Sequence, residues 1–468
     1  MTAVLAIRDL RVTAPGGGPL LRGVSLSVGA GHPLVILGET GSGKTLVVDA
    51  AMGTLAPELA ATGGIAVDGM EADAADRAAR RSLWGRRLAL LPQEPWLALD
   101  PTMRALGQVA ESHALVRGSP PARAWRQGRA DLAAFGIEDD MQERFPHQLS
   151  GGMAQRVAVA AARAGGATLL LADEPTKGLD ANRRNDVVAS LRAAADGGGS
   201  LLCVTHDVAV ARALGGTVAV MLDGAVVEQG PAATLLSAPQ HEYTRRLLAA
   251  EPAAWPEPGR GEPGETVLEA GDLAVSLGGR TLFAGLDLRI GAGEWVSVSG
   301  PSGCGKSTLG NVLLGVRRPD RGSVRRRPGL ARTGFGKLYQ DPVSTFAPRR
   351  PLRAELGEVA ARHRVPWTDV TGMLQRLGIA ETLLHRPPDA VSGGELQRVA
   401  IVRALLPNPA FLFADEPTSR LDPITQRDTL AALRDAAAER NCAVLLVTHD
   451  PVLAGKMASR NITLGGRA

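Results

Sequence analysis

The sequence predicts an α/β fold that is built twice in tandem, and three observations support this prediction. The chain has 468 residues, which is too long for one ordinary hydrophobic core and suits two or three domains. Several segments of the first half recur in the same order in the second half. In each half an apolar, strand-like run leads into a glycine-rich turn and a helix, as in proteins with a largely parallel sheet.

The repeated segments fix how the two halves align. ILGETGSGKT (36–45) returns as VSGPSGCGKS (298–307), QLSGGMAQRVAVAAAR (148–163) as AVSGGELQRVAIVRAL (390–405), and TLLLADEPTKGLD (168–180) as AFLFADEPTSRLD (410–422). The distance from the serine of SGG to the glutamate of ADE is 24 residues in both halves, whereas Lys44 to Gln93 spans 49 residues and Lys306 to Gln340 only 34. We therefore expect a surface insertion in the first half, between the glycine-rich loop and the glutamine.

Composition is that of a globular protein, with 45% hydrophobic, 21% charged and 3% aromatic residues. No apolar run approaches the ~18 residues that a spanning helix needs, and the N-terminal segment lacks the features of a secretory signal, so we expect a cytoplasmic chain. The cysteines, Cys203, Cys304 and Cys442, have no metal-site or disulfide spacing and are expected to be buried thiols. The net charge of +4 is too small to indicate nucleic-acid binding, and no nucleic acid is expected as a partner.

The domain boundary is predicted in the segment EPAAWPEPGRGEPGET (251–266), which is rich in Pro, Gly and Glu. This composition is typical of an exposed linker. We therefore predict a first domain at residues 1–252, a linker at 253–265 and a second domain at 266–468.

Two glycine-rich loops follow the GxxxxGK[ST] pattern and predict nucleotide phosphate binding. Their backbone N–H groups would surround phosphate oxygens, the lysine would add a charge at the β- and γ-phosphates, and the hydroxyl of Thr45 or Ser307 would ligate Mg²⁺. The architecture predicted at this point is two P-loop NTPase domains in tandem. The predicted phosphate-binding residues are Gly38, Glu39, Thr40, Gly41, Ser42, Gly43, Lys44 and Thr45, and Gly300, Pro301, Ser302, Gly303, Cys304, Gly305, Lys306, Ser307 and Thr308.

Acidic and polar residues at the ends of apolar strands supply the rest of each predicted site. Asp173 and Asp415 end buried-strand patterns and would hold the Mg²⁺ shell, and the adjacent Glu174 and Glu416 would act as general bases on the attacking water. His206 and His449 recur after the next strand and would contact the γ-phosphate. Gln93 and Gln340 share a Q-[ED]-P context. The predicted Mg²⁺ ligands are Thr45, Gln93, Asp173, Ser307, Gln340 and Asp415.

With these motifs together, the chain resembles an ABC-type ATPase over nearly its whole length. The resemblance implies a helical subdomain beside each mainly parallel sheet, and a head-to-tail arrangement that sandwiches two ATP molecules. Each ATP, with Mg²⁺, would be bound by the phosphate loop of one domain and the SGG loop of the other. The residues that the resemblance adds are the signature residues Ser150, Gly151, Gly152, Ser392, Gly393 and Gly394, and the D-loop residues Asp180 and Asp422.

Some positions depart from the family pattern. The aromatic residue that usually stacks on adenine is replaced by Ala14 in the first half and by Leu277 in the second. The first D-loop reads KGLD, where SALD is usual, so Lys177 and Gly178 are expected to alter communication between the domains. No residue needed for hydrolysis is missing from either half, which predicts two competent sites and argues against a structural pseudo-ATPase.

Local motifs resemble the importers of oligopeptides, dipeptides, nickel or metal-chelating opines. They are RFPHQLSGGMAQRVAVA (144–160), QEPWLALDPTM (93–103) and the tail SAPQHEYTRRLLAAEP (237–252), which has no counterpart in the second half. In such importers the two ATPases are commonly separate proteins, whereas in this chain they are fused. The resemblance implies that the chain is located at the cytoplasmic face of the inner membrane. Its partners would be two permease subunits, forming a heterodimer and contacting the segments that follow Gln93 and Gln340, and an extracytoplasmic solute-binding protein.

The main alternative is a twin ATPase that acts on ribosomes, as ABC-F-type translation factors do. In those proteins the segment between the domains is typically a long, charged helix, whereas here it is short and rich in Pro and Gly. A DNA-repair ATPase with zinc modules is disfavoured because the cysteines are too few. The sequence leaves the transported solute open.

Overall fold

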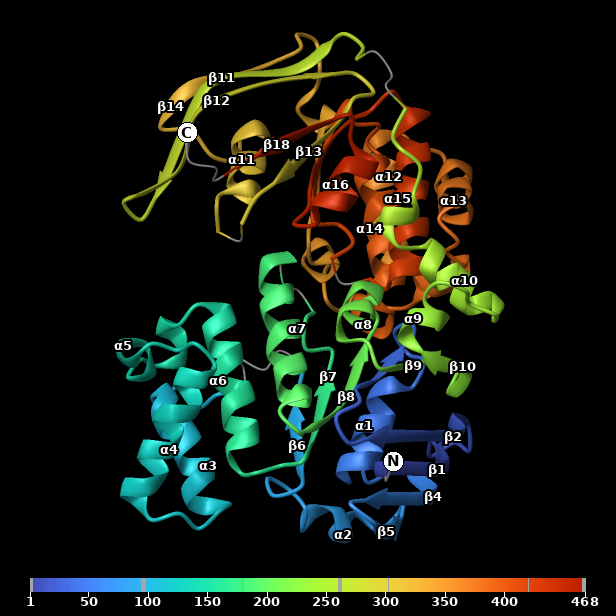
Figure 1. Cartoon of the computed structure of the whole chain (residues 1–468). Helices are drawn as coiled ribbons and strands as arrows, with labels where there is room; N and C mark the ends of the chain where they lie inside the picture. The colour runs from blue at the N-terminus through green and yellow to red at the C-terminus, as the bar shows by residue number, and fades with distance from the viewer. Residues whose placement is uncertain are drawn as a thin grey trace. The chain divides into compact units, whose positions relative to one another are not determined.

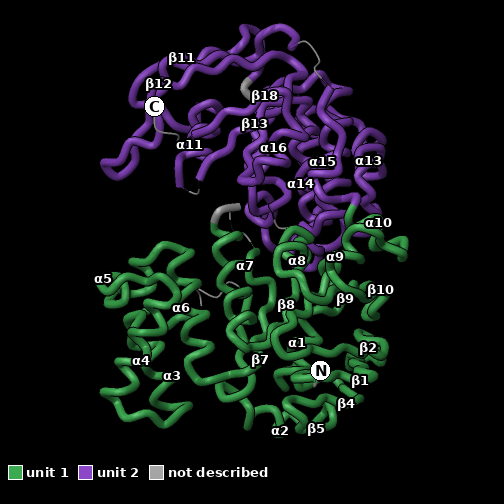
Figure 2. Tube along the Cα trace, in the orientation of Figure 1, with its two compact units in different colours: residues 1–248 green, residues 249–468 purple. Residues whose placement is uncertain are grey.

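The computed structural model describes residues 3–93, 98–177, 179, 181–259, 263–301, 303–419 and 421–464. The chain divides into two compact units, residues 1–248 and 249–468 (Figure 2). This division falls after Leu248, whereas the sequence placed the end of the first domain at residue 252. Part of the predicted linker packs against unit 2. Trp255 is buried in the core of the second unit, where it lies with Trp295, and Glu257 pairs with Lys456 at 2.6 Å.

Unit 1 contains two sheets (Figure 1). An antiparallel sheet has the order β2-β1-β4-β5, and a six-stranded sheet has the order β10-β9-β3-β8-β7-β6, parallel except for the hairpin β9–β10. The strands are β1 (Ala3–Thr13), β2 (Pro19–Gly29), β3 (Leu34–Leu37), β4 (Ala60–Val67), β5 (Met70–Asp73), β6 (Leu88–Leu91), β7 (Leu169–Asp173), β8 (Ser200–Thr205), β9 (Thr217–Leu222) and β10 (Ala225–Pro231).

The central strands form because their side chains are apolar on both faces. Every residue of β3, β7 and β8 is buried, as expected for parallel strands that are covered on both sides. The helices of unit 1 are α1 (Lys44–Met52), α2 (Arg77–Arg81), α3 (Ala105–Leu115), α4 (Pro121–Ala134), α5 (Asp139–Gln142), α6 (Gly151–Ala164), α7 (Ala181–Asp196), α8 (Val208–Leu214), α9 (Ala232–Leu235) and α10 (Glu242–Ala249).

Helices α3 to α6 form a helical subdomain beside the mainly parallel sheet (Figure 1). Helix α3 packs on α4 and α6, and α6 also contacts α7 and β6, which connects this subdomain to the sheet. Helix α6 is covered on several sides, because the consecutive residues Val157, Ala158 and Val159 point in different directions around the helix and all are buried.

Unit 2 repeats this plan. Its antiparallel sheet has the order β12-β11-β14 and its parallel sheet the order β15-β16-β17-β13-β18. The strands are β11 (Thr266–Leu277), β12 (Arg280–Gly291), β13 (Trp295–Ser299), β14 (Arg321–Arg326), β15 (Phe335–Leu338), β16 (Phe411–Asp415), β17 (Ala443–Val447) and β18 (Arg460–Thr463). The helices are α11 (Lys306–Leu313), α12 (Leu352–His363), α13 (Trp367–Arg376), α14 (Gly393–Leu405), α15 (Pro423–Ala438) and α16 (Pro451–Met457). The predicted fold class, two P-loop domains each with a parallel core and a helical subdomain, is confirmed.

The length difference between the halves corresponds to β5 and α2. They lie between α1 and β6 of unit 1, and β5 is the edge strand of its antiparallel sheet. Hydrogen bonds within the insertion connect α2 to the end of β5. The buried Arg80 side chain donates to the backbone oxygens of Asp73 and Ala74. The insertion therefore adds to the edge of the unit and leaves the strands that carry the site motifs unchanged.

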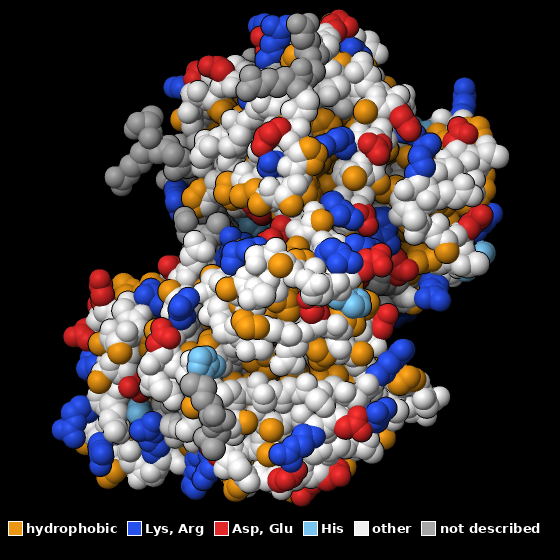
Figure 3. Space-filling model, turned by 45° about the vertical axis from the view of Figure 1, so that its right-hand side comes forward, with side chains coloured by type: hydrophobic (Ala, Val, Ile, Leu, Met, Phe, Trp, Pro, Cys, Tyr) orange, Lys and Arg blue, Asp and Glu red, His pale blue; other side chains and the backbone are white. Residues whose placement is uncertain are grey.

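Surface and cysteine properties agree with the composition. On the face shown in Figure 3, basic and acidic side chains are interspersed. Across the described residues, no helix combines the length and the hydropathy needed to cross a bilayer. All three cysteines are buried free thiols, as predicted, and burial raises the pKa of Cys442 to about 12.

Candidate nucleotide sites

The predicted motifs of unit 1 follow four neighbouring strands of one sheet. In the order β3-β8-β7-β6, these strands are followed respectively by the phosphate loop, His206, Glu174 and Gln93. Carboxyl ends of parallel strands meet at the same edge of a sheet, where α/β proteins bind their ligands. In unit 2 the order β13-β17-β16-β15 places Lys306, His449, Glu416 and Gln340 in the same way.

The phosphate loop of unit 1 needs glycine at two positions for different reasons. Gly43, which directly precedes α1, has φ 97°, in the left-handed region that glycine adopts most readily. At Gly38 a Cβ atom would come within 2.4 Å of the Met221 backbone oxygen. The Lys44 side chain is buried and donates from Nζ to the carbonyl oxygens of Gly38 and Glu39, at 2.8 and 2.7 Å.

The loop of unit 2 has the same construction. Gly305 has φ 103°, and a Cβ at Gly300 would meet the Leu464 backbone oxygen at 2.4 Å. Lys306 Nζ donates to the oxygens of Gly300 and Pro301, at 2.8 and 3.0 Å. Ser302, which the sequence also assigns to this loop, lies outside the described residues.

A residue of the tail supports the first phosphate loop, and the sequence did not predict it. Tyr243 of α10 is buried, and its hydroxyl oxygen accepts a hydrogen bond from the Glu39 backbone N–H at 2.9 Å. The equivalent position in unit 2 is Pro301, which has no N–H to donate. The first half thus has both the tail tyrosine and a loop residue with an N–H that can donate to it. At the equivalent loop position the second half has a proline.

The aspartates that end β7 and β16 fit the predicted Mg²⁺ role. Asp173 accepts a hydrogen bond from the Thr45 side chain, and Ser307 Oγ donates to Asp415 Oδ1 at 3.1 Å. Burial raises the pKa of Asp173 and of Asp415, against the effect of these hydroxyl groups. Asp173 Oδ1 is buried without a hydrogen-bond partner, as a carboxylate oxygen reserved for a cation would be. A hydroxyl and a carboxylate are the oxygen ligands that Mg²⁺ prefers.

The proposed general base of unit 1 is held in a strained backbone conformation. Glu174 has φ 46°, in the left-handed region that is unfavourable for non-glycine residues, and its N–H donates to the Val204 oxygen at 2.8 Å. Its carboxylate Oε2 lies 2.8 Å from His206 Nδ1. Burial opposes ionisation, but the hydrogen bond from His206 and the nearby positive charges hold the pKa of Glu174 below its ordinary value. The carboxylate is therefore ionised and able to accept a proton at neutral pH.

Unit 2 repeats this arrangement and adds the glutamine. Glu416 also has φ 46°, and its N–H donates to the Val447 oxygen at 3.1 Å. Glu416 Oε2 lies 3.4 Å from His449 Nδ1 and accepts from Gln340 Nε2 at 2.9 Å. Among the described residues, no hydrogen bond links Gln93 to the corresponding cluster in unit 1. The structure thus brings together glutamate and histidine in both units, and glutamine in unit 2.

The SGG segments are the N-terminal ends of two helices. Ser150 precedes α6 and its side chain accepts from the Met153 N–H at 3.3 Å. Ser392 precedes α14 and forms a capping box with Glu395, with Ser392 Oγ and Glu395 Oε2 2.6 Å apart. The following glycines leave backbone N–H groups at the positive end of each helix, which favours an anion there.

The remaining predicted residues differ in what the structure shows of them. Asp422 is buried and caps α15, accepting from the Thr425 N–H at 3.0 Å, while Asp180 lies outside the described residues, as does Gly178. Leu277, which replaces the expected aromatic residue, is at the end of β11 and is 57% exposed. The sequence missed Gln155, a buried residue of α6 whose Nε2 donates to the Pro175 oxygen next to Glu174, at 2.5 Å.

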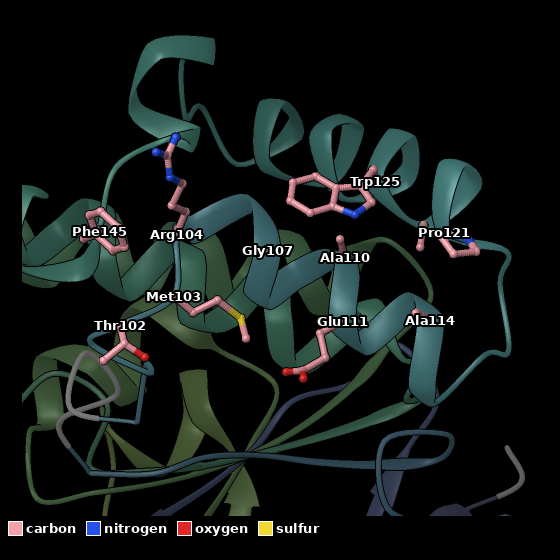
Figure 4. A pocket seen from close by; sticks show the side chains of 11 residues that line it. Thr102, Met103, Arg104, Gly107, Ala110, Glu111, Ala114, Pro121, Trp125 and Phe145 are labelled. Atoms are coloured by element: carbon pink, nitrogen blue, oxygen red, sulfur yellow. The ribbon is translucent and has the colours of Figure 1, made fainter.

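A pocket of about 460 Å³ opens on the helical subdomain of unit 1 (Figure 4). Its lining residues come from the segment before α3, from α3 and α4, and from Phe145, which follows α5. Met103, Trp125 and Phe145 make it largely apolar, and Arg104 and Glu111 are its charged residues. In unit 2 the position of Met103, ten residues after the motif glutamine, is occupied by Arg350. Arg350 forms a two-point ion pair with Glu358, at 2.6 and 3.1 Å. The corresponding surface of unit 2 is therefore charged.

Comparison with known proteins gives consistent results over both units. The family described as "ABC transporter" matches residues 21–177 and 283–419. The peptidoglycan transport ATP-binding protein YejF of Agrobacterium fabrum is 31% identical over 96% of this chain and 88% of its own. The glutathione import ATP-binding protein GsiA of Pectobacterium atrosepticum is 29% identical over 98% of this chain and 84% of its own. Among solved structures, "RNase-L Inhibitor" aligns with a TM-score of 0.68 at 22% identity, covering 98% of this chain and 88% of that one, which shows a shared fold.

Proposed function

Because the chain is an ATPase of the ABC transporter family, we propose that it powers the uptake of a peptide-like solute through a membrane permease. The proposal is supported by the phosphate-loop, glutamine, glutamate and histidine motifs, which follow neighbouring strands of one sheet in each unit, together with similarity to a transport ATP-binding protein over 96% of the chain. The named relatives are designated for peptidoglycan transport and glutathione import, and both solutes contain peptide-type amide bonds. This shared chemistry favours peptides over nickel or metal-opine solutes.

Hydrolysis would be carried out by the same residues in each unit. The phosphate loop would hold the triphosphate, and the lysine would neutralise its β- and γ-oxygens. Glu174 or Glu416 would accept a proton from the water that attacks the γ-phosphorus. The neighbouring His206 or His449 would orient this carboxylate and contact the γ-phosphate.

Bound Mg²⁺ would supply positive charge against the β- and γ-phosphate oxygens. In unit 1 its ligands would be Thr45 and Asp173, and in unit 2 Ser307 and Asp415, with Gln93 and Gln340 as the further predicted ligands. The hydroxyl–aspartate hydrogen bond keeps each pair of ligands together. These residues also position the reactive phosphate toward the glutamate.

Each ATP would be completed by the signature helix of the other unit. Ser150, Gly151 and Gly152 would serve the ATP bound at Lys306, and Ser392, Gly393 and Gly394 the ATP bound at Lys44. The support for this assignment is that both glycine pairs occupy the first positions of a helix, where backbone N–H groups have no partner within the helix and can bind phosphate. The D-loop residues Asp180 and Asp422 would connect the two sites. The exposed Leu277, in place of an aromatic residue, would pack on one adenine.

The permease partners would be two different subunits that bind the two helical subdomains. The pocket with Met103, Trp125 and Phe145 suits a short amphipathic helix with apolar side chains, and Arg104 and Glu111 add one charge of each sign to its lining. The Arg350–Glu358 pair at the equivalent place in unit 2 suits a polar contact. This difference supports a permease heterodimer at the cytoplasmic face of the membrane, supplied by an extracytoplasmic solute-binding protein.

The proposal is tested by combining Glu174→Gln and Glu416→Gln and measuring phosphate release from ATP. Removing both general bases is expected to lower turnover by ~10²–10⁴-fold while ATP binding remains, because the phosphate loops are unchanged. Affinity purification from membranes should recover two permease subunits with the wild-type chain. Wild-type turnover in the double variant would refute the mechanism, and recovery of ribosomes in place of permeases would refute the transport role.

A further inference from the structure

The two aspartates assigned to Mg²⁺ have different charged neighbours. In unit 2, Lys337 of β15 lies beside β16, and its Nζ is 3.9 Å from Asp415 Oδ2 and donates to Asn311 Oδ1 at 3.0 Å. The side chain is only 15% exposed and lies near the Phe413 and Tyr339 rings, 5.6 and 4.8 Å from their centroids. Packing of this kind keeps the ammonium group next to the aspartate.

Unit 1 carries different residues at both equivalent positions. Three residues before the motif glutamine, Leu90 replaces Lys337, and five residues after the loop lysine, Asp49 replaces Asn311. Asp49 is close enough to Asp173 to interact with its charge, and its Oδ1 accepts from Thr54 Oγ1 at 3.0 Å. The cation and the neutral amide of unit 2 are thus exchanged together for an apolar side chain and a carboxylate.

This exchange changes the charge at the centre of each site. The count takes the loop lysine, the acidic pair, the two exchanged positions and Lys177, whose charge acts on Glu174 and whose equivalent in unit 2 is Ser419. Unit 1 then has three carboxylates and two ammoniums, and unit 2 has two carboxylates and two ammoniums. The two sets therefore differ by one elementary charge. At partly buried positions such charges are screened less than at the surface.

We propose that Lys337 acts as a built-in countercharge that weakens divalent-metal binding in unit 2, so that the two ATP sites bind Mg²⁺ unequally. Unit 1, with its excess of carboxylates, binds the metal tightly and depends on it to accept the negative triphosphate. Unit 2, with balanced charges, binds the metal more weakly and tolerates metal-free nucleotide. Lys337 is a positioning residue, because it acts on the metal through Asp415. The proposal rests on the assignment of the two nucleotide sites given above.

The test measures metal binding by the full chain, using Mn²⁺ detected by electron paramagnetic resonance in the presence of a non-hydrolysable ATP analogue. The wild-type chain is expected to bind one Mn²⁺ tightly and one at least tenfold more weakly. The paired change Lys337→Leu with Asn311→Asp gives unit 2 the residues of unit 1 and is expected to produce two tight sites. The reverse pair, Leu90→Lys with Asp49→Asn, is expected to produce two weak sites.

Two single variants separate charge from packing. Lys337→Met keeps a long side chain without its charge and should strengthen the weak site, whereas Lys337→Arg keeps the charge and should leave it weak. A thermal-unfolding profile identifies any variant that fails to fold. Equal affinity of the two sites in the wild-type chain, or a weak site that Lys337→Met leaves unchanged, would overturn the role of Lys337. Absence of any analogue-dependent Mn²⁺ binding would instead overturn the nucleotide-site assignment itself.

Discussion

The hydrogen bond between Tyr243 and the Glu39 backbone makes a quantitative prediction about the tail. Tyr243→Phe removes only the hydroxyl group that accepts the Glu39 N–H, at 2.9 Å, and leaves the buried ring in place. Removing one partner of a hydrogen bond in a buried setting costs about 1–3 kcal/mol, because the other group loses its partner without regaining water. Glu39 itself is only partly buried, so the lower end, about 1 kcal/mol, is expected.

For a unit of this size, a loss of 1 kcal/mol lowers the midpoint of thermal unfolding by about 2–4 °C. Differential scanning calorimetry of the full chain should show this shift in only one of the two unfolding transitions. Hydrogen–deuterium exchange should be faster in the peptide that contains the first phosphate loop and unchanged in the peptide that contains the second. The matching loop in unit 2 is the internal control, because Pro301 cannot donate this bond.

A double-mutant cycle then tests whether the two residues act as a pair. Glu39→Pro introduces the residue that unit 2 carries and removes the N–H, so it should destabilise alone but add little to Tyr243→Phe. Strictly additive losses in the double variant would refute the reasoning, because they would show that the two groups contribute independently. Unchanged exchange of the first phosphate loop in Tyr243→Phe would refute it as well.

The remaining predictions concern the tail and the signature helix. The Glu228 carboxylate accepts hydrogen bonds from the Gln240 and His241 backbone N–H groups, at 2.8 and 3.1 Å. Burial opposes ionisation of Glu228, but these hydrogen bonds hold its pKa below the ordinary value. The stability that this carboxylate contributes is therefore present above its unfolded pKa of about 4.3 and is lost as the pH falls through the lower folded value. Thermal midpoints measured from pH 6 to 3 should fall less steeply in Glu228→Gln than in the wild-type chain, and parallel curves would contradict this. Ser150→Arg should block labelling by azido-ATP, trapped with vanadate, in the half of the chain that carries Lys306. The labelled half is identified after the chain is cleaved in the linker. Loss of label from the first half alone would contradict the crossed assignment.

The parts of the site that depend on local sequence could be predicted. A phosphate loop, a strand that ends in two carboxylates and a helix cap such as Ser150 are each encoded within a few consecutive residues, and their repetition reduced the chance of an accidental match. The parallel sheet also followed from uninterrupted apolar runs, because strands covered on both faces need no alternation.

The parts that depend on tertiary neighbours could not be predicted. Lys337 is separated from Asp415 by 78 positions, and only the pairing of β15 with β16 brings them together. Tyr243 is separated from Glu39 by 204 positions, and no motif indicates the contact. Trp255 lies in a segment whose composition indicated an exposed linker. Its large apolar side chain is nevertheless buried in the core of unit 2. The left-handed backbone of Glu174 has no sequence signal, because glutamate rarely adopts it.

The burial of all three thiols has a practical consequence for experiments on this protein. Cys203 lies in β8 and Cys442 directly precedes β17, and burial raises the pKa of each thiol and keeps it in the unreactive protonated form. Cys304 is buried within the second phosphate loop. A maleimide or nitroxide reagent should therefore modify engineered surface cysteines selectively, without prior removal of the native ones. Pairs of spin labels placed on the two units can then follow the ATP cycle in an otherwise unaltered chain.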